Sequence, residues 1–152
     1  MKYSYVGYKD GLRFQSESKS QLTPKYRPIV SIFDFDGVTR EGNHPSPGDI
    51  IVTGRTMEEA PIVYAYLRAN GLGDTPVYFN PIMLKDRQNH NDFAKSKSGN
   101  HKAKIIQLLK DNGVNIGKMH EDDPLQAGII KNRHPDIEIV KYPYDDKNNA
   151  DE

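Results

Sequence analysis

From Ile29 onward, short apolar runs alternate with segments of helical periodicity, and this alternation restricts the possible folds more than any other feature of the chain. The runs at 29–34 and 49–53 have the length of single strands, and their continuous apolar character is typical of strands buried on both faces. Strands that alternate with helices predict a parallel sheet covered by helices. We therefore predict an α/β fold, a Rossmann-like three-layer α/β/α sandwich with a mostly parallel central sheet.

The periodicity assigns a range to each element. We predict strands over 29–34, 49–53, 76–80, 115–120 and 137–141, and helices over 57–70, 101–112 and 124–133. Gly71 and Gly113 follow two of these helices, where a left-handed residue often ends a helix. In open α/β sheets ligands bind beyond the carboxyl ends of the strands, so polar residues at those ends are the first candidates for a functional site.

The chain divides into three parts. Its 152 residues suit one domain, and the strand–helix alternation is confined to residues 28–142. Residues 1–27 form a predicted N-terminal appendage, a short β-hairpin with strands near 2–8 and 12–15 followed by a polar linker. Residues 143–152 are polar and acidic, which predicts a disordered tail.

Composition excludes several classes of function. The chain has no cysteine, which excludes a disulfide framework, a thiolate zinc site and a cysteine nucleophile. No stretch approaches the ~18 apolar residues of a membrane span, and the N-terminus lacks a signal-peptide pattern. We therefore expect a cytoplasmic protein without membrane contact. Lysine plus arginine equals aspartate plus glutamate, 21 each, so the net charge favours no class of partner.

Two carboxylates follow the first predicted strand, at Asp34 and Asp36, and Gly37 then permits a sharp turn. Because side chains alternate along a strand, both carboxylates are expected to point the same way. Two such charges repel each other unless a cation or a proton lies between them. A calcium-binding EF-hand loop is the alternative, but Gly37 comes too early for it and Val38 stands where an oxygen ligand is needed. We therefore interpret the pair as a reactive centre.

Three further segments place polar residues near the ends of predicted elements. Residues 53–55, Thr-Gly-Arg, follow the second strand and open a predicted helix, where backbone N–H groups attract phosphate. Lys102 and Lys104 lie near the start of the next helix, and residues 121–123, Glu-Asp-Asp, follow a third strand. Each has a simpler explanation: a strand-end threonine, solvated lysines, or an acidic helix start with Asp123 as its N-cap.

Taken in order, the Asp-x-Asp signature, the strand-end threonine, the lysine and the acidic cluster resemble the haloacid dehalogenase (HAD) superfamily. The resemblance covers roughly residues 28–141. Most of that superfamily are magnesium-dependent phosphotransferases and phosphatases. The resemblance therefore implies that residues 28–142 are a HAD-like catalytic domain, a hydrolase that cleaves a phosphomonoester through an aspartyl-phosphate intermediate.

The resemblance also implies catalytic roles. Asp34 would be the nucleophile, and Asp36 would protonate the leaving group and then activate water. The Thr53 hydroxyl would hold a phosphoryl oxygen. Lys102 would hold the negative charges of Asp34 and the phosphoryl group together, with Lys104 as the alternative for this position.

The cofactor that the resemblance implies is Mg2+. Its ligands would be the Asp34 carboxylate, the backbone carbonyl of Asp36 and the Asp122 carboxylate. Glu121 is the alternative to Asp122 within the acidic cluster.

Gly54 and Arg55 are the expected substrate-binding residues, although a surface position suits Arg55 equally well. Residues 38–48 and 81–99 leave no room for the cap domain that family members place over a small substrate, so we expect an open site. Such a site suits a bulky substrate, for example a phosphorylated nucleic-acid end. Residues 85–104 hold six lysines or arginines and two aspartates, a local balance of +4 that fits a polyanion.

Two other functions stay open. One is a catalytically idle HAD-fold module used for binding or structure, although an idle site has no need of crowded carboxylates. The other is a phosphatase for a small nucleotide or sugar, closed by oligomerisation.

Overall fold

The computed structural model describes residues 5–6, 28–82, 84–87 and 92–144. Six strands of this part of the chain form one sheet in the order β1-β4-β3-β2-β5-β6, and every pair of neighbours is parallel. The strands are β1 (Tyr5–Val6), β2 (Ile29–Phe33), β3 (Ile50–Thr56), β4 (Val77–Asn80), β5 (Asn115–Glu121) and β6 (Glu138–Lys141). The predicted α/β fold with a parallel sheet is therefore confirmed.

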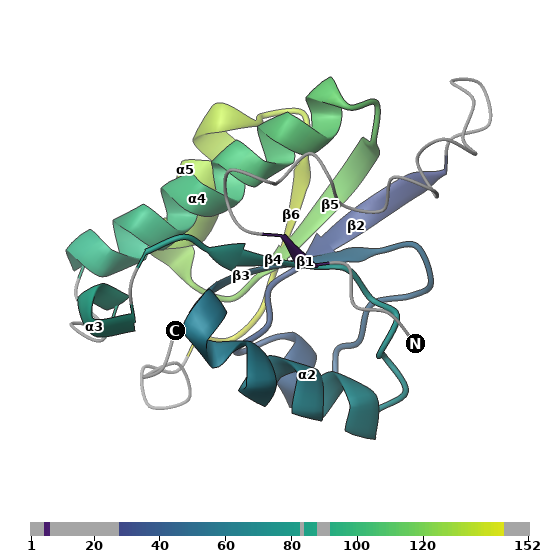
Figure 1. Cartoon of the computed structure of the whole chain (residues 1–152). Helices are drawn as coiled ribbons and strands as arrows, with labels where there is room; N and C mark the ends of the chain where they lie inside the picture. The colour runs from purple at the N-terminus through teal and green to yellow at the C-terminus, as the bar shows by residue number, and fades with distance from the viewer. Residues whose placement is uncertain (1–4, 7–27, 83, 88–91, 145–152) are drawn as a thin grey trace.

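Helices cover both faces of the sheet, as Figure 1 shows: α2 lies on one face, and α4 and α5 lie together on the other. The helices are α2 (Ala60–Ala69), α3 (Leu84–Arg87), α4 (Asp92–Asp111) and α5 (Pro124–Arg133), with short 3-10 turns at η3 (Thr39–Glu41) and η4 (Met57–Glu59). None of the helices in the described residues has the length and apolar composition that a bilayer crossing requires.

The core is built from alternating strand residues. In β2, Ile32 packs into the cluster that contains α4 and α5 residues, whereas the next residue, Phe33, packs into the cluster that contains α2 residues. Both clusters are formed by buried apolar side chains, which are the main source of folding free energy. By the same alternation Asp34 follows on the α4 side, where its partners lie.

The N-terminal residues Tyr5–Val6 fall inside the first strand of the predicted hairpin. They pair in parallel with β4 and so extend the edge of the main sheet. The predicted second hairpin strand at 12–15 lies outside the described residues, as do residues 145–152 of the predicted tail.

The segment 53–55 does not open a helix, contrary to our expectation. It belongs to β3, which continues to Thr56, and the pairing register with β4 shifts between Val52 and Thr56. The helical turns begin only after Thr56, which forms a reciprocal capping box with Glu59. Residues 53–55 therefore lie in an irregular strand end, a feature that often re-aims side chains beside active sites.

The predicted start of the helix at 101–112 is also wrong, because α4 begins at Asp92 and includes residues 92–100. Serine, glycine and asparagine lower the helix propensity of 96–100, but here they permit close packing. A Cβ on Gly99 would lie 2.9 Å from Ile129 Cδ1, and one on Gly54 would lie 2.8 Å from Ser98 Oγ. Tertiary packing therefore extends the helix, and Lys102 lies in its middle rather than at its start.

Candidate active site and metal centre

Asp34 is held at the carboxyl end of β2 by three hydrogen bonds. Its backbone N–H donates to the His120 carbonyl at 3.0 Å, which continues the ladder with β5. The Thr39 hydroxyl donates to the Asp34 carbonyl at 2.8 Å, and the Phe35 N–H donates to Asp34 Oδ1 at 2.9 Å. The backbone of Asp34 is therefore fixed, and one of its two carboxylate oxygens, Oδ1, is held by a hydrogen bond.

Lys102 joins two of the carboxylates. Its Nζ lies 2.9 Å from Asp34 Oδ1 and 2.7 Å from Glu121 Oε1. All three side chains are completely buried, so the ammonium group is their local counter-ion in a region of low polarity. Lys104 is exposed on α4. The structure thus brings Lys102, and not Lys104, to the acidic cluster.

Three buried carboxylates lie close enough to share a cation. Asp34, Glu121 and Asp122 each offer one oxygen, and these oxygens lie within 4.8 Å of one another. Asp34 Oδ2 is buried and has no hydrogen-bond partner, which is costly for a carboxylate oxygen without a cation. Carboxylate oxygens are the ligands that Mg2+ and Ca2+ prefer. The donor set therefore fits a hard divalent cation. The sequence left Asp122 and Glu121 as alternative ligands, and the structure places both within reach of the same ion.

Burial shifts the protonation of this cluster. Burial raises the pKa of Asp34 to about 7, with the Asp122 charge adding to the rise and the Lys102 charge opposing it. Burial and the Asp34 charge raise the pKa of Glu121 to about 8, again against Lys102. One lysine does not offset three crowded carboxylates, so the site attracts further positive charge, as a proton or a metal ion.

Asp36 has separate partners. Its carboxylate accepts hydrogen bonds from Arg55 Nε at 2.8 Å, from Arg55 Nη2 at 2.9 Å and from Arg40 Nη1 at 2.7 Å. Burial alone would raise the pKa of Asp36, but the Arg55 and Arg40 hydrogen bonds and charges outweigh it and lower the pKa. The expected repulsion between Asp34 and Asp36 is thus relieved by a different cation on each carboxylate.

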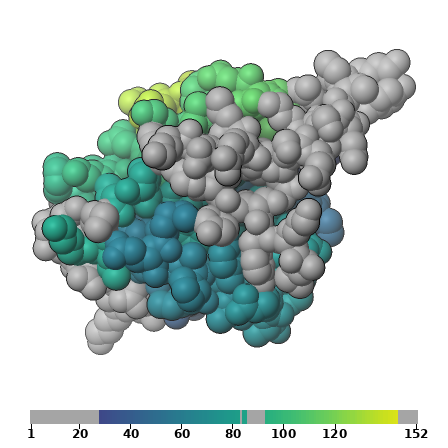
Figure 2. Space-filling view, viewed as in Figure 1, coloured from purple at the N-terminus to yellow at the C-terminus, as the bar shows by residue number. Residues whose placement is uncertain are grey.

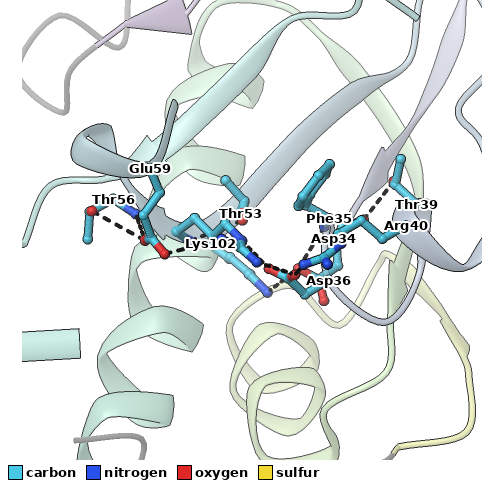
Figure 3. A network of polar contacts seen from close by, with 10 residues as sticks. Asp34, Phe35, Asp36, Thr39, Arg40, Thr53, Thr56, Glu59 and Lys102 are labelled. Atoms are coloured by element: carbon cyan, nitrogen blue, oxygen red, sulfur yellow. Dashed lines mark hydrogen bonds and ion pairs between the residues drawn. The ribbon is translucent and has the colours of Figure 1, made fainter. Parts of the chain in front are cut away.

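Arg55 is buried, and its guanidinium is committed to acidic partners within the chain. Besides Asp36 it reaches Glu59 Oε1 at 3.3 Å, and Glu59 in turn accepts from the Thr56 N–H at 2.7 Å. Figure 3 shows this chain of contacts running from Thr56 through Glu59 toward Asp36 and Asp34. Of the two positions that the sequence left open for Arg55, the surface is excluded because Arg55 is buried, and substrate contact stays a prediction.

Thr53 is buried beside these groups, and its hydroxyl accepts a hydrogen bond from the Arg55 N–H at 3.0 Å. Gly54 lies against Ser98 of α4. His101, the neighbour of Lys102, is also buried, and burial together with the Lys102 charge lowers its pKa to about 3. The imidazole is therefore neutral and adds no cation to the cluster.

Three residues of this network were not predicted from the sequence: Arg40, Glu59 and His101. The Thr-x-x-Glu spacing of Thr56 and Glu59 is a capping-box signature, so that contact was readable in advance. The Asp36–Arg40 contact has a local i,i+4 spacing that also could have been noticed, whereas nothing near His101 in the sequence indicates its burial. The predicted role of Asp123 is confirmed: it caps α5 and accepts hydrogen bonds from Leu125 and Gln126.

Comparison of the chain with protein-family models and with curated proteins gives no match.

Proposed function

We propose that this protein is a magnesium-dependent phosphomonoester hydrolase of the HAD type that works through an aspartyl phosphate on Asp34. One observation carries the proposal. Asp34 presents one oxygen held by Lys102 and the Phe35 N–H, and a second oxygen that has no donor and faces a metal-competent set of carboxylates. A carboxylate with one oxygen anchored and the other available is suited to act as a nucleophile.

In the first step Asp34 Oδ2 attacks phosphorus while the bond from phosphorus to the leaving oxygen breaks. The electron pair stays on the leaving oxygen, which takes a proton, and the carboxylate becomes an acyl phosphate. In the second step water attacks phosphorus, gives up a proton and restores the Asp34 carboxylate. Lys102 holds Oδ1 throughout and so keeps the reacting oxygen oriented.

The residues that would hold Mg2+ are Asp34, Glu121 and Asp122, with the Asp36 backbone carbonyl as a further oxygen. When bound, the ion supplies positive charge that allows an anionic carboxylate to approach an anionic phosphate. Glu121 Oε1 is already engaged by Lys102. This favours Asp122 as the principal ligand of the acidic pair and leaves Glu121 to position the lysine.

Asp36 is assigned the proton transfers. As a carboxylate it is ready to accept a proton from the attacking water in the second step. To donate a proton to the leaving group, Asp36 must first be protonated. Arg55 and Arg40 oppose this, because both lower the pKa of Asp36. Arg40 is the partner that can yield, because its side chain is 40% exposed, whereas Arg55 is 3% exposed.

The substrate class that we propose is a phosphate ester at the end of a polyanion, such as a nucleic-acid end. Support comes from the basic residues ahead of Lys102: Lys85 is exposed on α3, and Lys95 and Lys97 lie on the first turns of α4. Electrostatic attraction of this kind adds affinity for any polyanion without reading its sequence.

The test is hydrolysis of para-nitrophenyl phosphate with and without Mg2+, for the parent chain and for Asp34→Asn. Turnover should require Mg2+, vanish with chelator and be lost in Asp34→Asn, while circular dichroism shows the variant folded. Asp123→Asn, which keeps a capping side chain on α5, is the matched control and should retain turnover. Undiminished turnover in Asp34→Asn would reject the proposal.

A further inference from the structure

After β6 the chain continues through residues 142–144, a short segment that we call the strap. Tyr142 Oη lies 2.7 Å from His120 Nδ1, and the ring of Tyr144 lies 5.0 Å from Lys95 Nζ. His120 also stacks on Phe33, with ring centres 4.0 Å apart. The strap is therefore fastened to β5, the strand that supplies Glu121, and to α4, the helix that supplies Lys102.

The strand order places the site beside the direct path of this strap. β6 is an edge strand, whereas Lys95 lies one turn before Ser98, which contacts Asn80 of β4 and adjoins Gly54 of β3. The direct path from β6 to Lys95 therefore runs across the ends of β5 and β2, near Glu121 and Asp34. In Figure 1 the yellow trace leaving β6 runs toward the end of α4 that lies beside α3.

The dimensions agree with this path. Two strand spacings, from β6 to β2, amount to about 10 Å, and three extended residues after Lys141 span about 10 Å. Pro143 favours an extended conformation of Tyr142 before it. The strap therefore reaches the ends of the central strands without further chain.

The α4 contact of the strap lies on the helix face that carries the site lysine. Lys95, Ser98 and Lys102 are spaced i, i+3 and i+7, which places them on one face. Lys97 is on another face, is exposed, and its Nζ lies 4.7 Å from the ring of Phe93. Lys95 therefore lies along α4 between the strap and the buried cluster.

The reacting groups are closed off in this structure. Asp34, Lys102 and Glu121 have no exposed surface, although the loop lengths had led us to expect an open site. A phosphoryl group cannot reach Asp34 Oδ2 unless a covering segment moves. The strap is a candidate for this, because it contacts α4 and β5 through side chains, in the Tyr144–Lys95 cation–π contact and the Tyr142–His120 hydrogen bond.

We propose that residues 142–144 are a gate over the active site, latched by the Tyr144–Lys95 contact and hinged at the Tyr142–His120 contact. As a gate for phosphate esters it rests on the proposed function. Its opening, however, is a property of the fold and can be measured without turnover. In the space-filling view of Figure 2 the described elements pack closely together, and Asp34, Lys102 and Glu121 have no exposed surface, so a substrate needs a segment to move.

The experiment uses the absence of native cysteine. Asp122→Cys places one thiol in the closed acidic cluster, at a side chain that is 3% exposed, and iodoacetamide alkylates it when the gate opens. Adding Tyr144→Ala or Lys95→Met should raise the alkylation rate about tenfold, the effect expected for losing one partly desolvated cation–π contact. Tyr144→Phe keeps the ring and should label like the parent.

Lys97→Met is the matched control, because it removes a cation–π contact from the same turns of α4 but not the latch. It should leave the alkylation rate unchanged, which separates gate opening from fraying of the helix. Equal rates in the parent, Tyr144→Ala and Lys95→Met would overturn the gate. Acceleration by Lys97→Met to the same extent would overturn it as well. Either outcome would leave the phosphatase assay, which tests Asp34, unaffected.

Discussion

The Lys102 ammonium lies 2.9 Å from Asp34 Oδ1, although 68 positions separate the two residues in the chain. The same ammonium reaches Glu121, so a single buried cation links β2, α4 and β5. Its contact with both carboxylates offsets part of their charge, which lowers the cost of burying the acidic cluster before any metal binds.

Lys102→Met should therefore destabilise the metal-free protein at about pH 8 by about 3–5 kcal/mol, the cost of leaving buried charges without their partner. The loss should shrink as the pH falls, because the carboxyl groups then take up protons. Lys104→Met is the control and should change the free energy of unfolding by less than about 0.5 kcal/mol, as expected for an exposed side chain. Urea denaturation measures both, and equal effects of the two substitutions would contradict the counter-ion role.

Magnesium should stabilise the folded chain by mass action. At about 100 times its dissociation constant, the ion should add about 2.7 kcal/mol to the free energy of unfolding. Asp122→Asn should weaken this stabilisation most and Glu121→Gln less, since Glu121 already binds Lys102. Asp123→Asn, next in the chain but turned to the α5 cap, should retain it. A melting temperature that does not respond to Mg2+ would exclude the metal site.

The pH dependence of metal-free stability has a defined sign. The pKa values of Asp34 and Glu121 are raised from 3.8 and 4.5 to about 7 and about 8, so the folded state binds more protons than the unfolded state between those limits. Stability should therefore fall as the pH rises from about 5 to about 8.

Buried His101 acts in the opposite direction below about pH 6.5, because its pKa is lowered and the unfolded state takes up the proton. The informative quantity is thus the difference in stability between the parent and Asp34→Asn/Glu121→Gln, in which the histidine contribution cancels. This difference should grow in favour of the variant as the pH rises. A difference independent of pH would mean that the two carboxyl groups have ordinary pKa values.

The two arginines on Asp36 should differ in their contribution to stability. Arg55 is buried and makes a two-point contact, so Arg55→Lys should cost about 2–4 kcal/mol. Arg40 is partly exposed, and Arg40→Lys should cost less than about 1 kcal/mol. Thermal and urea unfolding of the two variants compare them directly, and similar losses would show that burial does not decide the strength of these contacts.

The strands of the sheet and the helices that cover it could be predicted, because each of these elements depends on a local apolar pattern. The convergence of Asp34 with the acidic cluster at 121–122 followed from their positions at strand ends, whereas Lys102 was expected at a helix start and lies in the middle of α4. Two other features could not be predicted in this way. The start of α4 at Asp92 depends on packing of Ser98 and Gly99 against other elements, which overrides their low helix propensity.

The role of Arg55 was missed for a related reason. Its sequence neighbourhood indicates a helix start, but the irregular end of β3 turns its guanidinium inward to Asp36. Long-range ion pairs of this kind leave no periodic trace in the sequence. The proposed gate at residues 142–144 likewise depends on strand order, which the sequence pattern alone does not fix.

The most direct test of the central claim is to trap the acyl phosphate. The full chain is incubated with Mg2+ and para-nitrophenyl phosphate and reduced with borohydride, which converts an acyl phosphate to an alcohol, and peptide mass spectrometry locates the change. We predict reduction at Asp34 alone, dependent on both Mg2+ and substrate, with Asp36 in the same region unchanged as an internal control. Substrate turnover without any modification of Asp34, or modification of a different carboxylate, would contradict the account.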